Sequence, residues 1–308
     1  MTKYIGFDFG GTTIKPGVVN EKGEIIEKTA FPTPKSRDTL LDSLMKTIED
    51  YQQRYQISAI GISSPGIVQS DGRLMTAGAI TCLNGVNLKP ILEKQTNLPV
   101  SIENDANAAA IAEHWIGAAQ GVNDYLCLVL GTGVGGGIVI NGQIYRGRHG
   151  MAGEFGWMVT KNFSLTENME NKSLNATSAV VDGLCLRYTK AKRQIKPRFR
   201  RVKDARIIFK AASDGDKLAQ SMLEEFYHDL SVGLIDLMAC FDPELILIGG
   251  GISASTEFAD GLTTALSDMK TRHKSLYRIR TELDIPVIPA KLSNDAGLIG
   301  AVYQSFHK

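Results

Sequence analysis

The chain has 308 residues, of which 43% are hydrophobic and 22% charged, and its formal net charge is +1. This length suits two domains of ordinary size, because single hydrophobic cores stop growing near roughly 250–300 residues. A net charge so close to zero argues against binding to nucleic acid or to a membrane through the whole surface. We therefore expect a globular α/β protein that binds small molecules at a local site.

The cysteines and the N-terminus indicate a reducing compartment. The four cysteines lie far apart and form no C-x-x-C pair of the kind that binds zinc or does redox chemistry. Their mostly apolar neighbours predict buried structural thiols. The first residues run directly into an apolar strand, without the charged and apolar stretches of a leader, and no run of 18 apolar residues occurs. We expect a cytoplasmic protein that has no membrane partner.

The first third of the chain predicts a strand meander and then a helix. Apolar residues alternate around glycine-containing turns, which predicts strands over Lys3–Phe9, Ile14–Asn20 and Glu24–Phe31. A helix is predicted to begin at Ser36, with one apolar face. That face comprises Leu41, Leu44, Met45, Ile48 and Tyr55. A buried strand, "ISAIGISSPG", follows, and a short strand from Val100 ends where "NDAN" begins another helix.

The rest of the chain repeats this plan. The stretch "YLCLVLGTGVGGGIVINGQIY" again predicts strand, glycine turn, strand, hairpin turn and strand. Helices are predicted around Ala211–Phe226 and Tyr227–Phe241, and an apolar strand in "ELILIGGGIS". Alternating strands and helices predict a mostly parallel or mixed sheet in each of two lobes, with a ligand cleft between them. We place the N-terminal lobe at 1–116, completed by a C-terminal helix at 293–308, and the second lobe at 117–292.

Three glycine turns each follow an apolar strand, at Gly10-Gly11, Gly131–Gly137 and Gly249–Gly251. Glycine lets backbone N–H groups approach a ligand, because no Cβ intervenes. Each turn alone could be a simple tight turn. Two of the three occupy matching positions in the repeat, and together they predict a nucleotide site. The first turn also carries hydroxyl groups and a nearby cation, as phosphate binding requires.

Seven segments together resemble the signature of the ROK family of sugar kinases and repressors, within the two-lobed actin-like (ribonuclease H-like) ATPase fold. The segments are "DFGGTTIK", "SSPGIV", "ENDANAAAIAE", "LGTGVGGGIVINGQIYRG", "GMAGEFG", "LIGGG" and "NDAGLIGA". The resemblance implies an α/β protein with ATP and a sugar in a central cleft, and Mg²⁺ near Asp8. The residues that it assigns to ATP are Asp8, Gly10, Gly11, Thr12, Thr13, Lys15, Gly131, Thr132, Gly133, Gly249, Gly250 and Gly251.

Asp105 is the candidate catalytic base. A carboxylate at the start of a helix stays ionised at neutral pH and can orient a sugar hydroxyl and accept its proton. The resemblance assigns the matching aspartate that role, and the alternative is that Asp105 only caps the helix. The resemblance also implies that Asn104 and Glu154 bind sugar hydroxyls, with Gly66 close by.

The chain departs from the family pattern where the family binds structural zinc. It has Trp157 in place of the usual histidine and no cysteine from Gly156 to Gly183, so no zinc site is expected. The aromatic face of Trp157 suits a sugar ring, although Trp157 could instead fill the core. The altered segment leaves Asn175 as a candidate substitute for a sugar-binding glutamate of the family.

A basic run covers Arg187–Arg206. Such runs are usually solvated surfaces, and the alternative is an anion or nucleic-acid patch.

We therefore expect an ATP-dependent kinase that phosphorylates the 6-hydroxyl of a hexose or hexosyl unit, with β-glucosides or glucose favoured and N-acetylmannosamine as the alternative. A sugar-responsive transcriptional regulator is the competing class. It is disfavoured because the first strand begins at Lys3, which leaves no room for a preceding helix-turn-helix. The expected partners are ATP and a small-molecule sugar, with no nucleic acid, and the resemblance implies a second copy of the chain.

Overall fold

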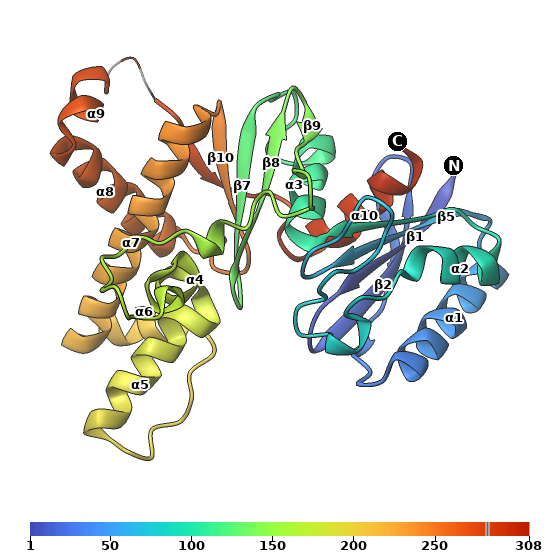
Figure 1. Cartoon of the computed structure of the whole chain (residues 1–308), viewed down its shortest axis with the longest axis horizontal. Coiled ribbons are helices and arrows are strands. Elements are labelled where there is room, and N and C mark those ends of the chain that lie inside the picture. Colours follow the sequence, from blue (N-terminus) through green and yellow to red (C-terminus); the bar gives the residue numbers. More distant parts are fainter. Residues whose placement is uncertain (281, 283, 308) are drawn as a thin grey trace. The chain divides into compact units, whose positions relative to one another are not determined.

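The computed structural model describes residues 1–280, 282 and 284–307. The chain divides into two compact units. Unit 1 comprises residues 1–123, 137–153 and 294–308, and unit 2 comprises 124–136 and 154–293. Each unit contains strands and helices that alternate along the chain (Figure 1).

The sheet of unit 1 is mixed, as predicted. Its strands are β1 (Lys3–Phe9), β2 (Thr13–Asn20), β3 (Ile25–Lys28), β5 (Ile57–Ser64) and β6 (Val100–Asn104), in the order β3-β2-β1-β5-β6. β1, β2 and β3 form the predicted antiparallel meander, and β5 and β6 run parallel to β1. The predicted third strand is interrupted after Lys28, and its second part, the short β4 (Phe31–Pro32), also pairs with β2.

The helices of unit 1 are α1 (Arg37–Arg54), α2 (Leu88–Thr96), α3 (Asp105–Ile116) and α10 (Ala296–Phe306), with 3₁₀ turns η1 (Thr81–Leu83) and η5 (Ser293–Asp295). Ser36 begins α1 as predicted, since its Oγ accepts a hydrogen bond from Thr39 N. The buried face of α1 is rotated from the predicted one. It comprises Leu40, Leu44, Ile48 and Tyr51, while Leu41 and Met45 are half-buried.

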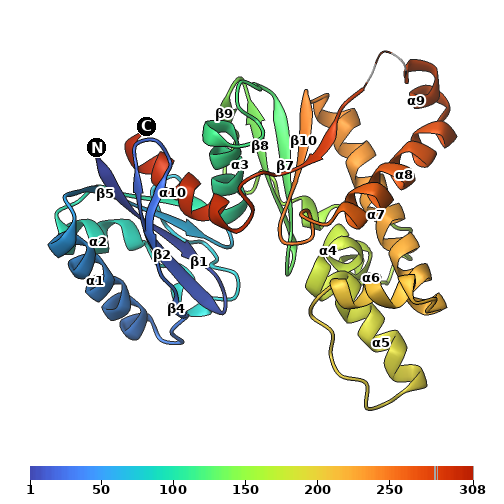
Figure 2. The ribbon, with the colours of Figure 1, turned by 180° about the vertical axis from the view of Figure 1, so that it is seen from behind.

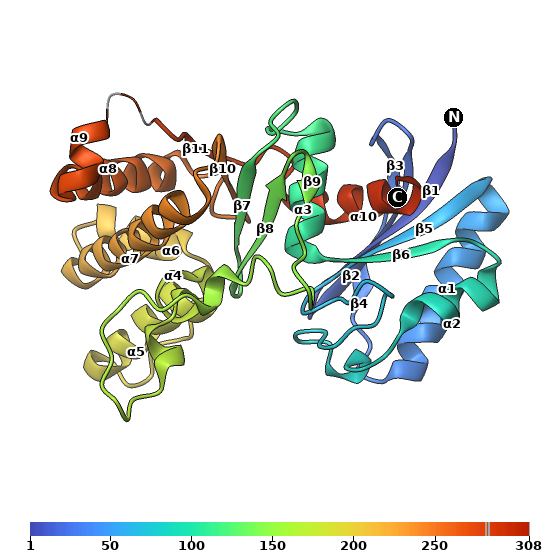
Figure 3. The ribbon, with the colours of Figure 1, turned by 45° about the horizontal axis from the view of Figure 1, so that its top comes forward.

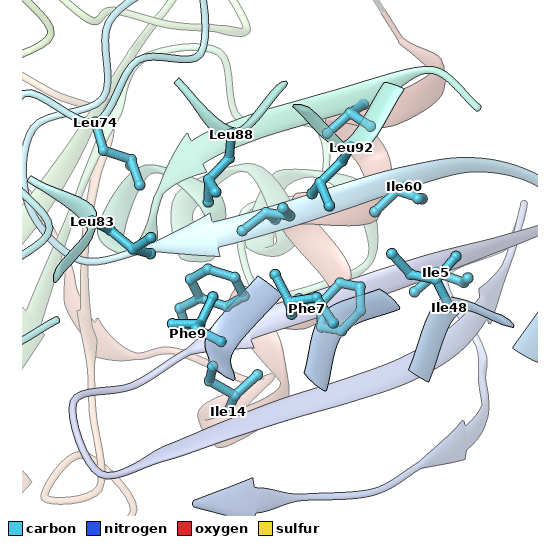
Figure 4. Packing of buried hydrophobic residues seen from close by; sticks show 14 of the residues in the cluster. Ile5, Phe7, Phe9, Ile14, Ile48, Ile60, Leu74, Leu83, Leu88 and Leu92 are labelled. Atoms are coloured by element: carbon cyan, nitrogen blue, oxygen red, sulfur yellow. The ribbon is translucent and has the colours of Figure 1, made fainter. Parts of the chain in front are cut away.

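Two layers of helices cover this sheet. On one face, Ile5, Phe7 and Phe9 of β1 pack in one buried cluster with Ile48 of α1 and Leu92 of α2 (Figure 4). On the other face lie α10 and α3, which run side by side (Figure 3). The close approach of α10 depends on glycine. A Cβ on Gly61 would lie 2.0 Å from the carbonyl oxygen of Ala301, and one on Gly300 would lie 1.8 Å from that of Ala108.

The second sheet repeats the connectivity of the first. Its strands are β7 (Tyr125–Leu130), β8 (Val134–Ile140), β9 (Gln143–Ile144), β10 (Leu245–Gly249) and β11 (Val287–Pro289). The order β9-β8-β7-β10-β11 matches β3-β2-β1-β5-β6 element for element. β10 is parallel to both β7 and β11, and the Asn141-Gly142 turn joins β8 to β9. The predicted internal repeat is therefore confirmed.

The helical part of unit 2 corrects one prediction (Figure 2). Its elements are η2 (Phe155–Trp157), η3 (Met169–Lys172), α4 (Leu174–Ser178), the π-helix η4 (Val180–Cys185), α5 (Leu186–Ile195), α6 (Arg206–Ser213), α7 (Lys217–Phe241), α8 (Thr256–Arg272) and α9 (Lys274–Ile279). The predicted helix boundary after Phe226 is wrong, because α7 continues through it. The break lies earlier, where Gly215 has φ +91° and Asp216 caps α7 by accepting from Leu218 N.

The thiols differ in exposure. Cys127 and Cys185 are buried and Cys82 is half-buried, but Cys240 is exposed near the end of α7, so the prediction of buried thiols is wrong there. Burial raises the pKa of Cys185 to about 11, which makes that thiol unreactive at neutral pH. Within the described residues, every helix is too short or too polar to span a lipid bilayer.

Candidate active site

The first glycine turn joins β1 to β2 and is closed by its own hydrogen bonds. Gly10 N donates to the carbonyl oxygen of Thr13 at 3.0 Å, and Thr33 Oγ1 donates to that of Gly10 at 2.6 Å. A Cβ on Gly11 would lie 2.6 Å from the Cβ of Ala79, so the turn has no room for a side chain there. Thr12 is exposed at its tip. The turn thus presents a hydroxyl and backbone groups on a rigid support.

Asp8 faces Lys15 across the β1–β2 pair. Lys15 Nζ lies 3.1 Å from Asp8 Oδ2, and Ser63 Oγ donates to Asp8 Oδ1 over a long 3.4 Å. The start of α10 also lies close to this carboxylate, because a Cβ on Gly297 would lie 2.8 Å from Asp8 Oδ1. The side chain of Asp8 is 18% exposed. A fixed, partly open carboxylate next to a phosphate turn suits Mg²⁺, which commonly takes one or two carboxylates together with phosphate oxygens.

Asn104 organises the start of α3. Its Oδ1 accepts from the backbone N–H groups of Ala106 and Asn107, at 2.9 and 3.0 Å, so Asn104 is the helix cap. Its Nδ2 donates to the carbonyl oxygen of Gly66 at 2.8 Å and to Asp105 Oδ1 at 3.2 Å. Asp105 is the first helical residue, and the alternative that it is the cap is not what the structure shows. The amide of Asn104 therefore joins the candidate base to the turn after β5.

Gly66 is required in that turn. Its φ is +89°, and a Cβ there would lie 2.4 Å from the carbonyl oxygen of Thr76. Unit 1 thus brings Gly66, Asn104 and Asp105 into one connected group.

Glu103 is a buried residue of this region that the sequence analysis missed. Its Oε1 accepts from Asn104 N and Asn107 Nδ2, both at 3.0 Å. Its Oε2 accepts from Arg146 Nε and Nη2 at 2.9 and 2.6 Å. An acidic residue at a buried strand position, two residues before the candidate base, was the available signal. Its partner lies 43 residues away and could not be read from local pattern.

The glycine loop after β7 is braced by the π-helix. Gly131 N donates to the carbonyl oxygen of Gly133 at 2.9 Å, and the N–H groups of Val180 and Val181 donate to that of Gly131 at 3.0 and 3.1 Å. Asp182 N donates to the carbonyl oxygen of Thr132 at 3.3 Å. A Cβ on Gly131 would meet nothing within 4 Å, so one side of the loop is open.

The glycine loop after β10 packs on the end of β7. Gly250 has φ +91°, and a Cβ there would lie 2.2 Å from the carbonyl oxygen of Leu130. A Cβ on Gly251 would meet nothing within 4 Å. Unit 2 therefore brings its two predicted nucleotide loops together, with open space at one glycine of each.

Glu154 directly precedes the short turn η2, and Trp157 is the last residue of that turn. The carbonyl oxygen of Glu154 accepts from Trp157 N at 3.0 Å, and burial raises the pKa of the Glu154 carboxyl. Trp157 is 52% exposed, so the alternative that it fills the core is wrong. Its ring is available to a ligand. Among residues 1–280, 282 and 284–307, no three His, Cys, Asp or Glu side chains are grouped to hold a metal ion.

Comparisons with known proteins bear on this arrangement. A family model described as "ROK family" matches residues 4–305. A beta-glucoside kinase of Listeria innocua is 37% identical over 303 residues, covering 98% of this chain and 96% of that protein. A glucokinase of Halalkalibacterium halodurans is 32% identical, covering 96% and 93%.

A solved structure is similar over the same extent. It is a ROK family glucokinase from Streptomyces griseus in complex with glucose and AMPPNP, with a TM-score of 0.81, 30% identity, and coverage of 98% of this chain and 99% of that one. The match covers both sheets and every segment that carries the candidate site residues. The chain therefore belongs to the ROK family.

Proposed function

We propose that this chain transfers the γ-phosphate of ATP to the 6-hydroxyl of a hexose or hexosyl unit, with β-glucosides or glucose as the favoured acceptors. At the coarser level, the chain is an ATP-dependent sugar kinase of the ROK family. The finer assignment rests on the exposed ring of Trp157 beside Glu154. The names of two relatives, a beta-glucoside kinase and a glucokinase, support the same acceptors.

The chemistry that we assign to the chain is mostly positioning and charge neutralisation. Phosphoryl transfer passes through a loose transition state, in which alignment and electrostatics contribute most of the catalysis. Asp105 would orient the acceptor hydroxyl and receive its proton. Bound Mg²⁺, held through Asp8 and the phosphates, would neutralise charge on the transferred group.

The remaining assignments divide between the units. The Gly10–Thr13 turn with Lys15 in unit 1, and the Gly131–Gly133 and Gly249–Gly251 loops in unit 2, would bind the nucleotide. Asn104 and Gly66 in unit 1, and Glu154 and Trp157 in unit 2, would bind the sugar. The homodimer that the family resemblance implies stays a prediction.

Trp157 is the residue that we expect to determine whether the site accepts capped sugars, which are substituted at O1, as well as free sugars. A site built to pair with the hydroxyls at C1 and C2 would reject a sugar capped at O1, because each buried polar group left unpaired costs about 1–3 kcal/mol. An aromatic face instead accepts the apolar face of a second ring. We therefore expect a β-linked substituent at C1 to be tolerated.

The test is ATP-dependent turnover, followed by ADP release with Mg²⁺ present, on glucose, N-acetylmannosamine, cellobiose and methyl β-glucoside. Both capped sugars should reach at least about a tenth of the kcat/KM of glucose, since two unpaired groups at about 1–3 kcal/mol each would cost more than the roughly 1.4 kcal/mol of a tenfold loss. Strong preference for a free monosaccharide, with both capped sugars inert, would refute the acceptor assignment and leave the kinase assignment intact.

A further inference from the structure

We infer that Asn175 is a positioning residue for the nucleotide loop of unit 2, and that it ties this loop to the sugar-side turn η2. The inference rests on the proposed kinase function. It departs from the expectation that Asn175 substitutes for a sugar-binding glutamate. The structure shows the side-chain oxygen already engaged by the protein backbone.

The contact that carries the inference is short and lies at the exit of the loop. Val134 is the first residue of β8, and its N–H donates to Asn175 Oδ1 at 2.6 Å. Val134 is only 4% exposed, so water cannot easily replace the acceptor if the amide is removed. An unpaired buried N–H group is costly, and the loop end would move to find a partner.

The backbone at Gly133 and Gly156 packs closely around the side-chain amide of Asn175. A Cβ on Gly133 would lie 3.1 Å from Asn175 Oδ1, and a Cβ on Gly156 would lie 2.3 Å from the same atom and 2.5 Å from the carbonyl oxygen of Val134. Gly156 lies inside η2, between Glu154 and Trp157. One side-chain oxygen therefore touches the nucleotide loop and the turn that carries two proposed sugar residues.

The loop is thus held at its two ends by two consecutive short helical segments, α4 and η4. The π-helix fixes the entry through the bonds of Val180 and Val181 to Gly131, and Asn175 of α4 fixes the exit at Val134. The α4 helix is itself anchored to the residue that ends η2, because Leu174 N donates to the carbonyl oxygen of Met158 at 2.8 Å. A loop bracketed in this way is preorganised for phosphate, and releasing one end should weaken ATP binding more than sugar binding.

The first experiment compares Asn175→Leu with Asn171→Leu. Leucine keeps the size of the side chain but offers no acceptor, and Asn171 is an exposed residue of the preceding 3₁₀ turn η3. Asn175→Leu should raise the KM for ATP by about tenfold and leave the KM for glucose within about twofold, because it removes the hydrogen bond that holds the end of the nucleotide loop. Asn171→Leu should change neither. A raised KM for glucose with an unchanged KM for ATP would overturn the inference.

The second experiment needs no catalysis and remains decisive if one variant is unstable or the enzyme is inactive. Amide hydrogen exchange of Val134 is followed by NMR in the ligand-free protein and in Asn175→Leu, Asn175→Asp and Gly156→Ala. Asp keeps an acceptor and should preserve protection of Val134, whereas Leu should lose it. Gly156→Ala should also lose it, because its methyl group would lie 2.3 Å from Asn175 Oδ1 and force the amide away from Val134. Unchanged exchange of Val134 in Asn175→Leu would refute the positioning role of Asn175, whatever the activity of the enzyme.

Discussion

Arg146 and Glu103 form a partly buried ion pair, and Glu103 lies two residues before the proposed base. Two nitrogens of the guanidinium donate to Glu103 Oε2 at 2.9 and 2.6 Å, and the Glu103 side chain is only 5% exposed. Its other oxygen holds Asn104 N, so the pair fixes the junction from which Asn104 and Asp105 project. A buried carboxylate is tolerable only with such donors around it.

We expect Arg146→Met to destabilise unit 1 and to lower kcat. Removing one partner of a buried pair costs about 3–5 kcal/mol, and we expect roughly 2–3 here because the Arg146 side chain is 37% exposed. Denaturant unfolding measures the loss, with Arg148→Met on the same loop as an exposed control. Adding Glu103→Gln should restore part of the stability, because it removes the uncompensated charge. Strictly additive losses would argue against the pair.

Asp105→Asn should keep the fold and ATP binding but reduce kcat by about 10²–10⁴, the usual contribution of a general base. Asparagine retains an oxygen to accept from Ala106 N, as Asp105 Oδ1 does at 2.8 Å, so the helix start is preserved. The matched control is Asp38→Asn, an exposed aspartate in the first turn of α1. If Asp105→Asn retained more than about a tenth of wild-type kcat, the role of base would be lost.

Local pattern predicted the elements around the site well. β1 was predicted at its observed bounds, because alternating burial and a glycine turn both mark its end. The start of α3 followed from the capping residue Asn104. The predicted break inside α7 is wrong, because the residues that separate the two helices lie earlier: Gly215 has a left-handed backbone and Asp216 caps α7.

Long-range side-chain pairing was not predictable in the same way. The sequence gives no local sign that Arg146 reaches Glu103, or that Asn175 reaches Val134 across 41 residues. Both contacts depend on the backbone geometry of glycines and loops that are distant in the chain. Trp157 shows the same limit, because its exposure depends on what packs around η2 and not on its neighbours in the sequence.

The purified protein should contain no stoichiometric zinc, and chelators should not lower its melting temperature. The segment after η2 is held by ion pairs, in which Lys161 Nζ lies 2.9 Å from Asp229 Oδ2 of α7, rather than by a cysteine cluster. Chelation should abolish turnover, and Mg²⁺ alone should restore it. Metal analysis that finds one tightly held zinc per chain, or activity that returns only with zinc, would contradict this prediction.

Trp157→Ala should selectively impair capped sugars. Because the ring is half exposed, its removal should cost little stability, while loss of stacking on a second ring should lower kcat/KM for cellobiose by about 3–10-fold relative to glucose. Trp157→Phe should recover much of the difference. Equal losses on glucose and cellobiose would mean that the ring does not contact the aglycone.

Glu154→Gln should stabilise the protein in a pH-dependent way while weakening sugar binding. Burial raises the pKa of the Glu154 carboxyl, so the fold disfavours its charged form. The stability associated with the protonated group is present below its unfolded pKa, about 4.3, and is lost as the pH rises through the folded pKa. Glutamine stays neutral, so the melting temperature of Glu154→Gln should match that of the wild type at about pH 4 and exceed it at about pH 7.5.

Glu167→Gln is the opposite control. Lys172 lowers the pKa of the Glu167 carboxyl, so removal of that carboxylate should destabilise the protein at the higher pH only. If Glu154→Gln changed the melting temperature equally at both pH values, the substitution would not act by removing the buried charge.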